Sequence, residues 1–185
     1  MDSFLDKFLR RLRFGEVVKH IPKNSIVCDI GCGSDALFLR SISGKIQQGI
    51  GLDEKVENYR DAKFEFKKFK VFKDIPLERE SCDAVTMIAV LEHLTSLQLV
   101  LNESFRILKK GGKLILTTPT PLAKPILDFF AFKLRLIDEG EIRDHKNYFW
   151  PKDIKKMLKE SGFTEEDIRS KYFEFFLNSL IIAKK

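Results

Sequence analysis

Long apolar runs and cysteine pairs are both missing from the sequence, and each absence excludes a class of protein. No apolar run approaches the roughly 18 residues that a membrane-spanning helix needs. The first residues, MDSFLDKFLRRLRFGE, place acids and arginines between their apolar side chains, so they do not resemble a secretory signal. We therefore expect a cytoplasmic protein.

Cysteine is scarce, since the chain has three and an odd number cannot all pair. No Cys-x-x-Cys motif or Cys/His cluster is present, so zinc and other metals are not expected. Cys28 and Cys32 lie in or beside a glycine-rich turn. We interpret them as small, reduced packing residues.

What is present indicates one globular domain over residues 1–185. The chain is 44% hydrophobic and 32% charged, which is enough for one sizeable core, and it has no repeat, linker or low-complexity stretch. The net charge of +6 is compatible with an anionic partner, but the basic residues are spread along the chain and favour a solvated surface. Nucleic acid is not an expected partner, and oligomeric state is not indicated.

Apolar runs and helical periodicities alternate along the chain. This alternation predicts an α/β fold: a Rossmann-like three-layer sandwich around a mostly parallel seven-stranded sheet that ends in an antiparallel hairpin. The expected strands are 25–30, 45–52, 82–90, 113–118 and two within 168–183, with a turn near Asn178-Ser179. The expected helices are 3–13, 34–42, 95–111, 121–137 and 151–161.

The segment KFEFKKFKVFKD (63–74) is less regular. Phe64 and Phe66 share one face of an extended chain, whereas Phe69 and Val71 fall on the other. One straight strand cannot direct both pairs inward. We therefore place a break near Lys67-Lys68 and the third core strand after it.

Helix ends are also predicted. Ser34 is a candidate N-cap, and Thr95 with Gln98 forms a capping-box pattern. Gly111 is expected to end the helix that begins at this box.

The turn VCDIGCGSDA (27–36) admits two interpretations. Gly31, Gly33 and Ala36 satisfy the Gly-x-Gly-x-x-Gly/Ala spacing between a strand and a helix, and Asp53 lies where a ribose-binding acid belongs. A dinucleotide is one ligand that fits this pattern. A ligand with a cationic group near the turn is the other.

Asp29 favours the cationic ligand. A carboxylate two residues before Gly31 would repel a pyrophosphate, whereas it would accept a charge-assisted hydrogen bond from an ammonium group. A ligand with an amino-acid head, a ribose and an adenine suits Asp29, the glycines and Asp53 together. S-adenosylmethionine, whose product is S-adenosylhomocysteine, is that ligand.

Several segments together resemble one family. VCDIGCGSD is similar to the strand-turn glycine motif of class I S-adenosylmethionine-dependent methyltransferases, and GIGLD (49–53) to their second-strand acidic motif. The pattern is most similar to the type 11 group, which includes ubiquinone and menaquinone methylating enzymes. Three later segments also match in order: KDIPLERESCDAVTMIAVLEHL (73–94), ESFRILKKGGKLILTTPTP (103–121) and HKNYFWPKDIKKMLKESGF (145–163).

The resemblance implies a set of cofactor contacts. Two positions depart from the family pattern: Asp35 replaces a frequent third glycine, and Val71 replaces an acid that often contacts adenine. Either Val71 and Phe72 supply backbone and apolar contacts there, or Asp74 substitutes for the acid. The implied cofactor residues are Asp29, Gly31, Cys32 and Gly33 for the methionine part, Asp53 and Glu54 for the ribose, Val71 and Phe72 beside the adenine, and the Ile88 and Ala89 backbone for the amino group.

The acceptor is expected to be a small molecule methylated on oxygen or carbon. The chain has no Asn/Asp-Pro-Pro-Tyr/Phe motif after its fourth strand, which argues against methylation of a base nitrogen or amide. His93 and His145 are candidate bases for an acceptor that must lose a proton. Residues 1–22 are expected to form a helical cap, and residues 119–150 are expected to form a lid over the acceptor. Exposure of both segments together would favour a lipid-like acceptor and peripheral membrane contact. Lysines near them would favour an anionic acceptor.

Two other functions remain open on the sequence. The Asp35 and Val71 departures are compatible with a protein that binds S-adenosylmethionine without turnover. The glycine turn is compatible with a nicotinamide-dependent oxidoreductase, which Asp29 and the later motifs oppose.

Overall fold

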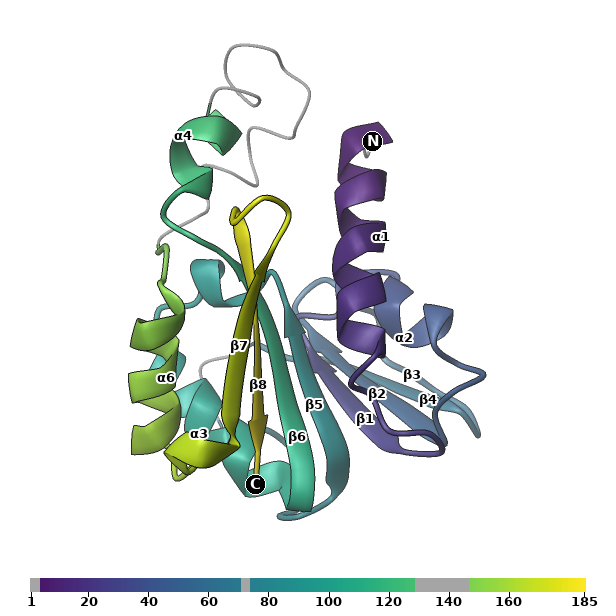
Figure 1. Cartoon of the computed structure of the whole chain (residues 1–185). Coiled ribbons are helices and arrows are strands. Elements are labelled where there is room, and N and C mark those ends of the chain that lie inside the picture. The colour runs from purple at the N-terminus through teal and green to yellow at the C-terminus, as the bar shows by residue number, and fades with distance from the viewer. Residues whose placement is uncertain (1–3, 71–73, 129–146) are drawn as a thin grey trace.

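The computed structural model describes residues 4–70, 74–128 and 147–185. Within them the strands form one sheet in the order β3-β4-β2-β1-β5-β6-β8-β7 (Figure 1). The strands are β1 (Ile26–Ile30), β2 (Gln48–Asp53), β3 (Tyr59–Arg60), β4 (Phe64–Lys68), β5 (Cys82–Ile88), β6 (Leu108–Pro119), β7 (Ile168–Phe173) and β8 (Asn178–Lys184).

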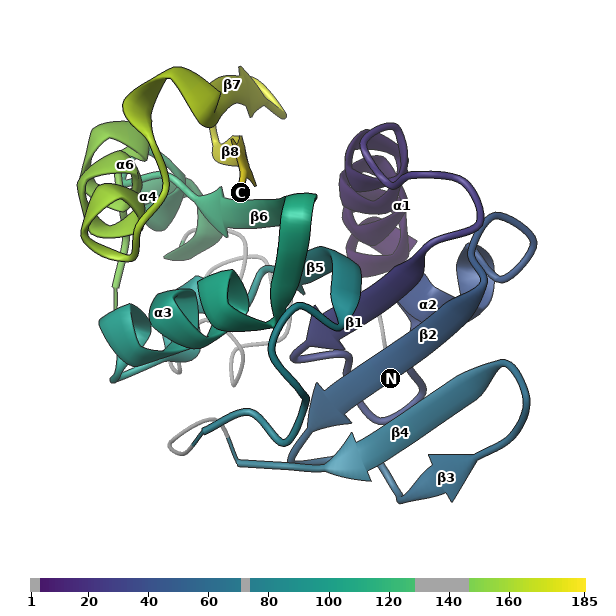
Figure 2. The same ribbon diagram turned by 90° about the horizontal axis from the view of Figure 1, so that it is seen from below.

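Helices cover both faces of this sheet, which makes three layers. One face carries α1 (Phe4–Val18) and α2 (Leu37–Ser41), and the other carries α3 (Leu97–Ile107) and α6 (Pro151–Glu160), as Figure 2 shows. Shorter pieces are α4 (Ala123–Asp128) and the 3-10 helices η1 (Leu91–His93) and η3 (Glu165–Asp167). No helix in the described ranges is long and apolar enough to cross a membrane.

The central strands are buried on both faces because their side chains alternate between two cores. Val27 belongs to the core under α1 and α2, whereas Cys28 belongs to the core under α3 and α6. Ala84 and Val85 on β5 divide in the same way. This two-sided burial is why these strands read as continuous apolar runs rather than as alternating ones.

The predicted fold class is confirmed. Strands β4, β2, β1, β5 and β6 pair in parallel, and the sheet ends in the antiparallel pairs β6·β8 and β7·β8. The sheet has eight strands instead of the expected seven. The additional strand, β3, is two residues long and pairs antiparallel with β4 at the sheet edge.

The predicted position of the third core strand is wrong. The strand is Phe64–Lys68, before the expected break, and its register places Phe64 beside Gly49 and Phe66 beside Gly51. Phe69 instead packs against the core on the opposite face of the sheet. The change of face that the sequence displays marks the end of this strand and not its beginning.

The predicted helix ends also need correction. Helix α2 begins after Ala36, whose backbone is left-handed, so Ser34 is not its N-cap. Helix α3 begins after Ser96 without a side-chain cap, and Gln98 binds the Ser161 hydroxyl instead of completing a capping box. Helix α3 ends at Ile107 and Gly111 lies inside β6.

Two further boundaries differ from expectation. Helix α1 continues through Gly15 to Val18, past the predicted end at residue 13. The hairpin turn occupies 174–177, between β7 and β8, rather than Asn178-Ser179. The helix predicted over 121–137 is present as α4, and the part beyond residue 128 lies outside the described residues.

Phenylalanine rings pack closely over the glycines of β2, and this contact yields a test of the sheet. A Cβ at position 51 would lie 2.8 Å from Cys32 Sγ and 2.9 Å from Phe66 Cδ1. We expect Gly51→Ala to lower the free energy of unfolding by about 1–3 kcal/mol, because the well-packed layer must shift to accept a methyl group. Urea denaturation measures this change.

Gly44→Ala is the matched control. A Cβ there meets no atom within 4 Å, so we expect a change within about 0.5 kcal/mol. Equal destabilisation by both substitutions would contradict the packing described for β2.

Candidate cofactor site

The carboxyl ends of the five parallel strands meet at one edge of the sheet, at the top of Figure 1, which we call the upper edge. Ligands of open α/β sheets bind outside this edge, where crossovers diverge to opposite faces. The glycine turn connects β1 to α2 here, and its residues Gly31 and Gly33 have φ values of +77° and +72°. Both conformations favour glycine, because a side chain would strain a left-handed backbone.

Asp29 lies in β1 just before this turn, and its side chain is buried, with 2% of its surface exposed. Its register partner on β5 is Thr86, whose hydroxyl donates a hydrogen bond of 2.6 Å to Asp29 Oδ1. Burial raises the pKa of Asp29 to about 7, the Thr86 hydroxyl opposes the shift, and the charge of Asp53 adds to it. A buried carboxyl of this kind ionises more readily when a cation is brought beside it.

Asp53 ends β2 and holds the turn in place. Its Oδ2 accepts a hydrogen bond of 2.8 Å from the Gly33 amide, and its Oδ1 accepts one of 2.7 Å from the Lys55 amide. The turn is also tied to β2 through the Gly31 amide, which donates to the Leu52 carbonyl at 2.7 Å. Each carboxylate oxygen keeps a second lone pair, so Asp53 can still accept from a ligand hydroxyl.

The two glycines of the turn face different surroundings. A Cβ on Gly31 would lie 2.4 Å from Val90 Cγ2, so this glycine is required by packing against the segment after β5. A Cβ on Gly33 would meet no atom within 4 Å. Gly33 therefore borders open space, where the backbone of the turn is accessible to a ligand.

The segment after β5 forms the other side of this region. Ala89 has a left-handed backbone, with φ of +56°, and its amide donates to the Thr117 carbonyl at 3.0 Å. An ammonium group only donates hydrogen bonds, so it would bind the carbonyl oxygens of Ile88 and Ala89 and not their amides.

Two further predicted residues have different surroundings. The Cys32 side chain is buried, and burial, then the charges of Asp29 and Asp53, raise the pKa of its thiol well above the usual range. It therefore packs as an uncharged group. Glu54 is exposed, and its Oε2 lies 4.0 Å from Lys70 Nζ.

The predicted catalytic histidines are only partly described. His93 ends η1 and is half-buried, and its amide donates to the Val90 carbonyl at 3.0 Å. His145, Val71, Phe72 and most of the predicted lid lie outside the described residues. In the described ranges, no group of three or more His, Cys, Asp or Glu side chains is arranged to hold a metal ion.

Sequence reasoning missed two buried polar groups. Thr86 lies within an apolar run, and only the pairing of β1 with β5 brings it to Asp29. Glu92 is 1% exposed, and its Oε2 lies 3.4 Å from the Thr118 hydroxyl. An acid in the apolar sequence MIAVLEHL was the available signal for Glu92.

Comparison with known proteins identifies the family of the chain. Residues 1–167 match the family described as "Methyltransferase domain", so the chain belongs to that family, and the resemblance of its motifs is confirmed. It is 27% identical over 156 residues to a ubiquinone biosynthesis O-methyltransferase of Psychrobacter arcticus, covering 77% of this chain and 60% of the relative. The chain thus spans 60% of the length of that relative.

Two more comparisons are informative. A demethylmenaquinone methyltransferase of Symbiobacterium thermophilum is 24% identical over 182 residues, covering 80% of this chain and 72% of the relative. The crystal structure of a SAM-dependent methyltransferase from Archaeoglobus fulgidus aligns with a TM-score of 0.72 and 20% identity, covering 96% of this chain and 94% of that one. The second comparison establishes the shared fold.

The buried Asp29 carboxyl predicts a stability that depends on pH. Its pKa is about 7 in the folded protein and about 3.9 when unfolded, so folding favours its protonated form. The stability contributed by this group is fully present below pH 4 and is lost as pH rises to 7. At pH 8 Asp29→Asn should therefore be more stable than the parent by on the order of 4 kcal/mol, and near pH 4 the difference should fall below about 1 kcal/mol.

Denaturant titrations at several pH values measure this difference. Asp35→Asn is the control, because it removes an exposed carboxylate from the same turn. A parent protein that is more stable than Asp29→Asn at pH 8 would contradict the assignment of Asp29 as a buried carboxyl whose charged form is disfavoured.

Proposed function

We propose that this chain transfers a methyl group from S-adenosylmethionine to an oxygen or carbon of a small, apolar acceptor by in-line displacement. The observation that carries the proposal is the buried Asp29 carboxyl beneath a glycine turn at the upper edge. A buried carboxyl is favoured to ionise when a cationic head group lies beside it, and in its ionised form it repels the phosphates of a dinucleotide.

The residues present fit this cofactor. The Asp29 carboxyl would attract its ammonium group, and the open space beside Gly33 admits the methionine part close to the backbone. Asp53 ends the neighbouring strand and has lone pairs left for ribose hydroxyls. Glu54 lies next to it, and Val71 and Phe72 stay predicted contacts for the adenine.

When bound, the cofactor supplies a methyl group that is already activated as part of a sulfonium. The chain's own residues would then orient the reactants and exclude water, which is the main requirement of such a displacement. A base is needed only for an acceptor that must lose a proton. His93 and His145 remain the predicted candidates for that role.

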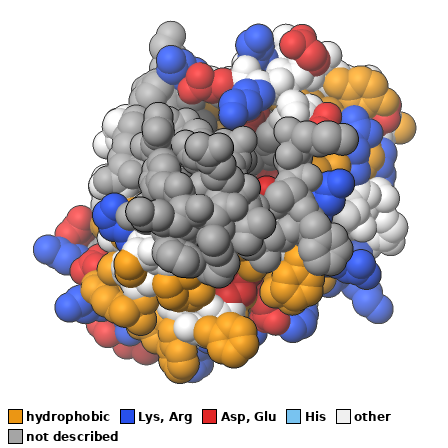
Figure 3. Space-filling model, turned by 90° about the horizontal axis from the view of Figure 1, so that it is seen from above, with side chains coloured by type: hydrophobic (Ala, Val, Ile, Leu, Met, Phe, Trp, Pro, Cys, Tyr) orange, Lys and Arg blue, Asp and Glu red, His pale blue; other side chains and the backbone are white. Residues whose placement is uncertain are grey.

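Exposed apolar side chains at the upper edge support an apolar acceptor. Phe175 and Phe176, at the tip of the β7–β8 hairpin, are 95% and 61% exposed. Figure 1 places the hairpin tip, α4 and the start of α1 at this end of the molecule, and Figure 3 shows hydrophobic side chains around its margin. Phe8 and Leu12 on α1, Ile126 on α4 and Leu122 just before α4 are also exposed.

The hairpin tip is held to its neighbours by polar contacts. Glu174 lies in the turn with its Oε1 3.9 Å from Arg13 Nε on α1, and its other oxygen accepts from the Asn178 amide. The Thr120 hydroxyl donates to the Phe176 carbonyl at 2.8 Å. The Thr120 amide also donates to the Leu177 carbonyl at 2.9 Å, so the turn is tied to the end of β6 and the tip can act as one wall of an acceptor site.

Relatives named for quinone methylation also support an apolar acceptor. Exposed aromatic residues near the arginines of α1 favour contact with a membrane surface, from which such an acceptor would be taken. The residue 1–22 cap and the 119–150 lid are the predicted acceptor-binding parts of a single domain. A cytoplasmic location remains the expectation from the sequence.

Calorimetric titration tests the cofactor assignment. S-adenosylhomocysteine should bind and NAD⁺ should not. Asp29→Asn should lower the affinity for S-adenosylhomocysteine by about tenfold or more, because a charge-assisted hydrogen bond is lost. Gly33→Ala should lower this affinity by a similar factor, because its methyl group occupies the space left for the ligand. It should lower the free energy of unfolding by only about 1–2 kcal/mol.

Turnover is tested with S-adenosylmethionine labelled in its methyl group and a series of alkyl hydroquinones. We expect label in the hydroquinone oxygens, at a rate that rises with alkyl chain length. Binding without methyl transfer to any member of the series would favour a non-catalytic binding protein. Saturation by NAD⁺ would refute the assignment outright.

The hairpin tip gives a prediction about the acceptor alone. Phe175→Ser with Phe176→Ser should raise the KM for a long-chain hydroquinone about tenfold, since two exposed aromatic contacts are lost, and should leave the affinity for S-adenosylhomocysteine unchanged. Leu99→Ser on α3, which replaces another exposed apolar residue (36% exposed), is the control. An equal KM in both variants would exclude the tip from the acceptor site.

A further inference from the structure

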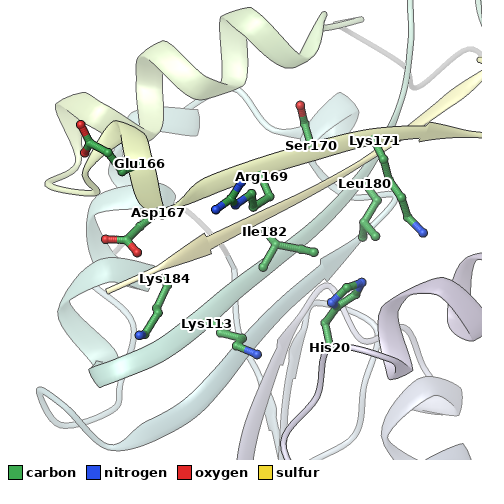
Figure 4. Close-up of a pocket in the computed structure, with 10 residues that line it drawn as sticks. All are labelled: His20, Lys113, Glu166, Asp167, Arg169, Ser170, Lys171, Leu180, Ile182 and Lys184. Atoms are coloured by element: carbon green, nitrogen blue, oxygen red, sulfur yellow. The ribbon is translucent and has the colours of Figure 1, made fainter.

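A second concave site lies on the α1 side of the sheet, between the end of α1 and strands β6, β8 and β7. It has a volume of 480 Å³, and Figure 4 shows the side chains around it. The pocket is lined by His20, Lys113, Glu166, Asp167, Arg169, Ser170, Lys171, Leu180, Ile182 and Lys184. None of these residues belongs to the proposed cofactor site.

The floor of this pocket is apolar and its surroundings are basic. Leu180 and Ile182 on β8 form the floor, and they pack with the core under α1. Four positive charges surround the floor, on Lys113, Arg169, Lys171 and Lys184. The two carboxylates of Glu166 and Asp167 lie together at the end away from His20, as Figure 4 shows.

The strand register brings these cations together. Lys113 on β6 and Lys184 on β8 are directly opposite each other. Arg169 on β7 is opposite Ile182, which lies two residues before Lys184 on β8. Like charges that face each other across two strands destabilise a sheet. An anion bound between them would relieve that repulsion.

Three of the cations form no ion pair with the residues that the structure describes. Lys171 pairs with Glu16 of α1. Lys113, Arg169 and Lys184 have no carboxylate within 4.0 Å in the part of the chain that is described. Their charge therefore remains available to a ligand.

His20 adds a polar group at the same place. Its Nε2 atom is buried and has no hydrogen-bond partner, and Figure 4 shows the Lys113 side chain directed toward its ring. Burial lowers the pKa of His20, and the positive charges of Lys171 and Lys113 lower it further. These surroundings disfavour a further positive charge, as expected where the cations face one another.

We propose that this pocket binds a small phosphate-bearing molecule, with its phosphate among Lys113, Arg169 and Lys184 and its apolar part on Leu180 and Ile182. Lysine and arginine bind phosphate through charge-assisted hydrogen bonds, and arginine does so with two parallel donors. An apolar floor beneath cationic walls suits a ligand that carries both groups.

Calorimetric titrations with pyrophosphate and with ATP test this site. Saturating S-adenosylhomocysteine is present throughout, so that neither probe can occupy the glycine turn. Both should bind, ATP more tightly because it also covers the apolar floor, and Lys113→Gln with Arg169→Gln should weaken binding about tenfold or more. The affinity for S-adenosylhomocysteine should not change in this variant.

Lys152→Gln with Lys156→Gln is the control of equal charge, because both lysines are exposed on α6, on the opposite face of the sheet. An equal loss of affinity in the control, or no loss in the pocket variant, would overturn the proposal. The affinity for S-adenosylhomocysteine is measured in a separate titration of each variant, so failure of this site is distinguishable from failure of the proposed function.

Proton NMR of the histidine side chains gives an independent readout. Pyrophosphate should raise the pKa of His20, because an anion beside it offsets the positive charges that now depress it. His20→Asn identifies the resonance among the three histidines of the chain. An unchanged His20 titration at saturating pyrophosphate would place the anion elsewhere and overturn the proposal.

Discussion

The hydrogen bond between Thr86 and Asp29 joins the two central strands at the point on which the candidate site depends. The carboxyl is buried between β1 and β5, and the hydroxyl 2.6 Å away is the polar partner that the structure provides for it. A carboxyl in this setting favours its neutral form until a positive charge arrives. The protein thus keeps a group that opposes its own stability at neutral pH and favours a cationic ligand, a conflict that is common at functional sites.

Packing below the turn explains why that carboxyl is so well placed. Gly49 and Gly51 on β2 leave room for the rings of Phe64 and Phe66, which lie over β2 from the neighbouring strand β4. Cys32 fills the remaining space above Gly51. The turn therefore rests on a close-packed layer, and Asp53 fixes its far side through the Gly33 amide.

The two ends of the molecule offer different chemistry. The upper edge combines a buried acid with exposed aromatic residues of the β7–β8 hairpin, which suits a cationic cofactor and an apolar acceptor. The pocket beside α1 combines unneutralised cations with an apolar floor, which suits a phosphate. Because the same hairpin strands line both places, β7 and β8 contribute to two sites that share no side chain.

By itself the sequence determined the alternation of strands and helices, the glycine turn and the acids Asp29 and Asp53, because these features depend on local periodicity and on spacing along the chain. It misplaced the third core strand, since a change of face at Phe69 looks the same whether a strand begins or ends there. Only the tertiary structure decided that Thr86 meets Asp29 and that Lys113 faces Lys184. Those neighbours arise from strand pairing between residues 57 and 71 positions apart in sequence, and long-range register leaves no local trace.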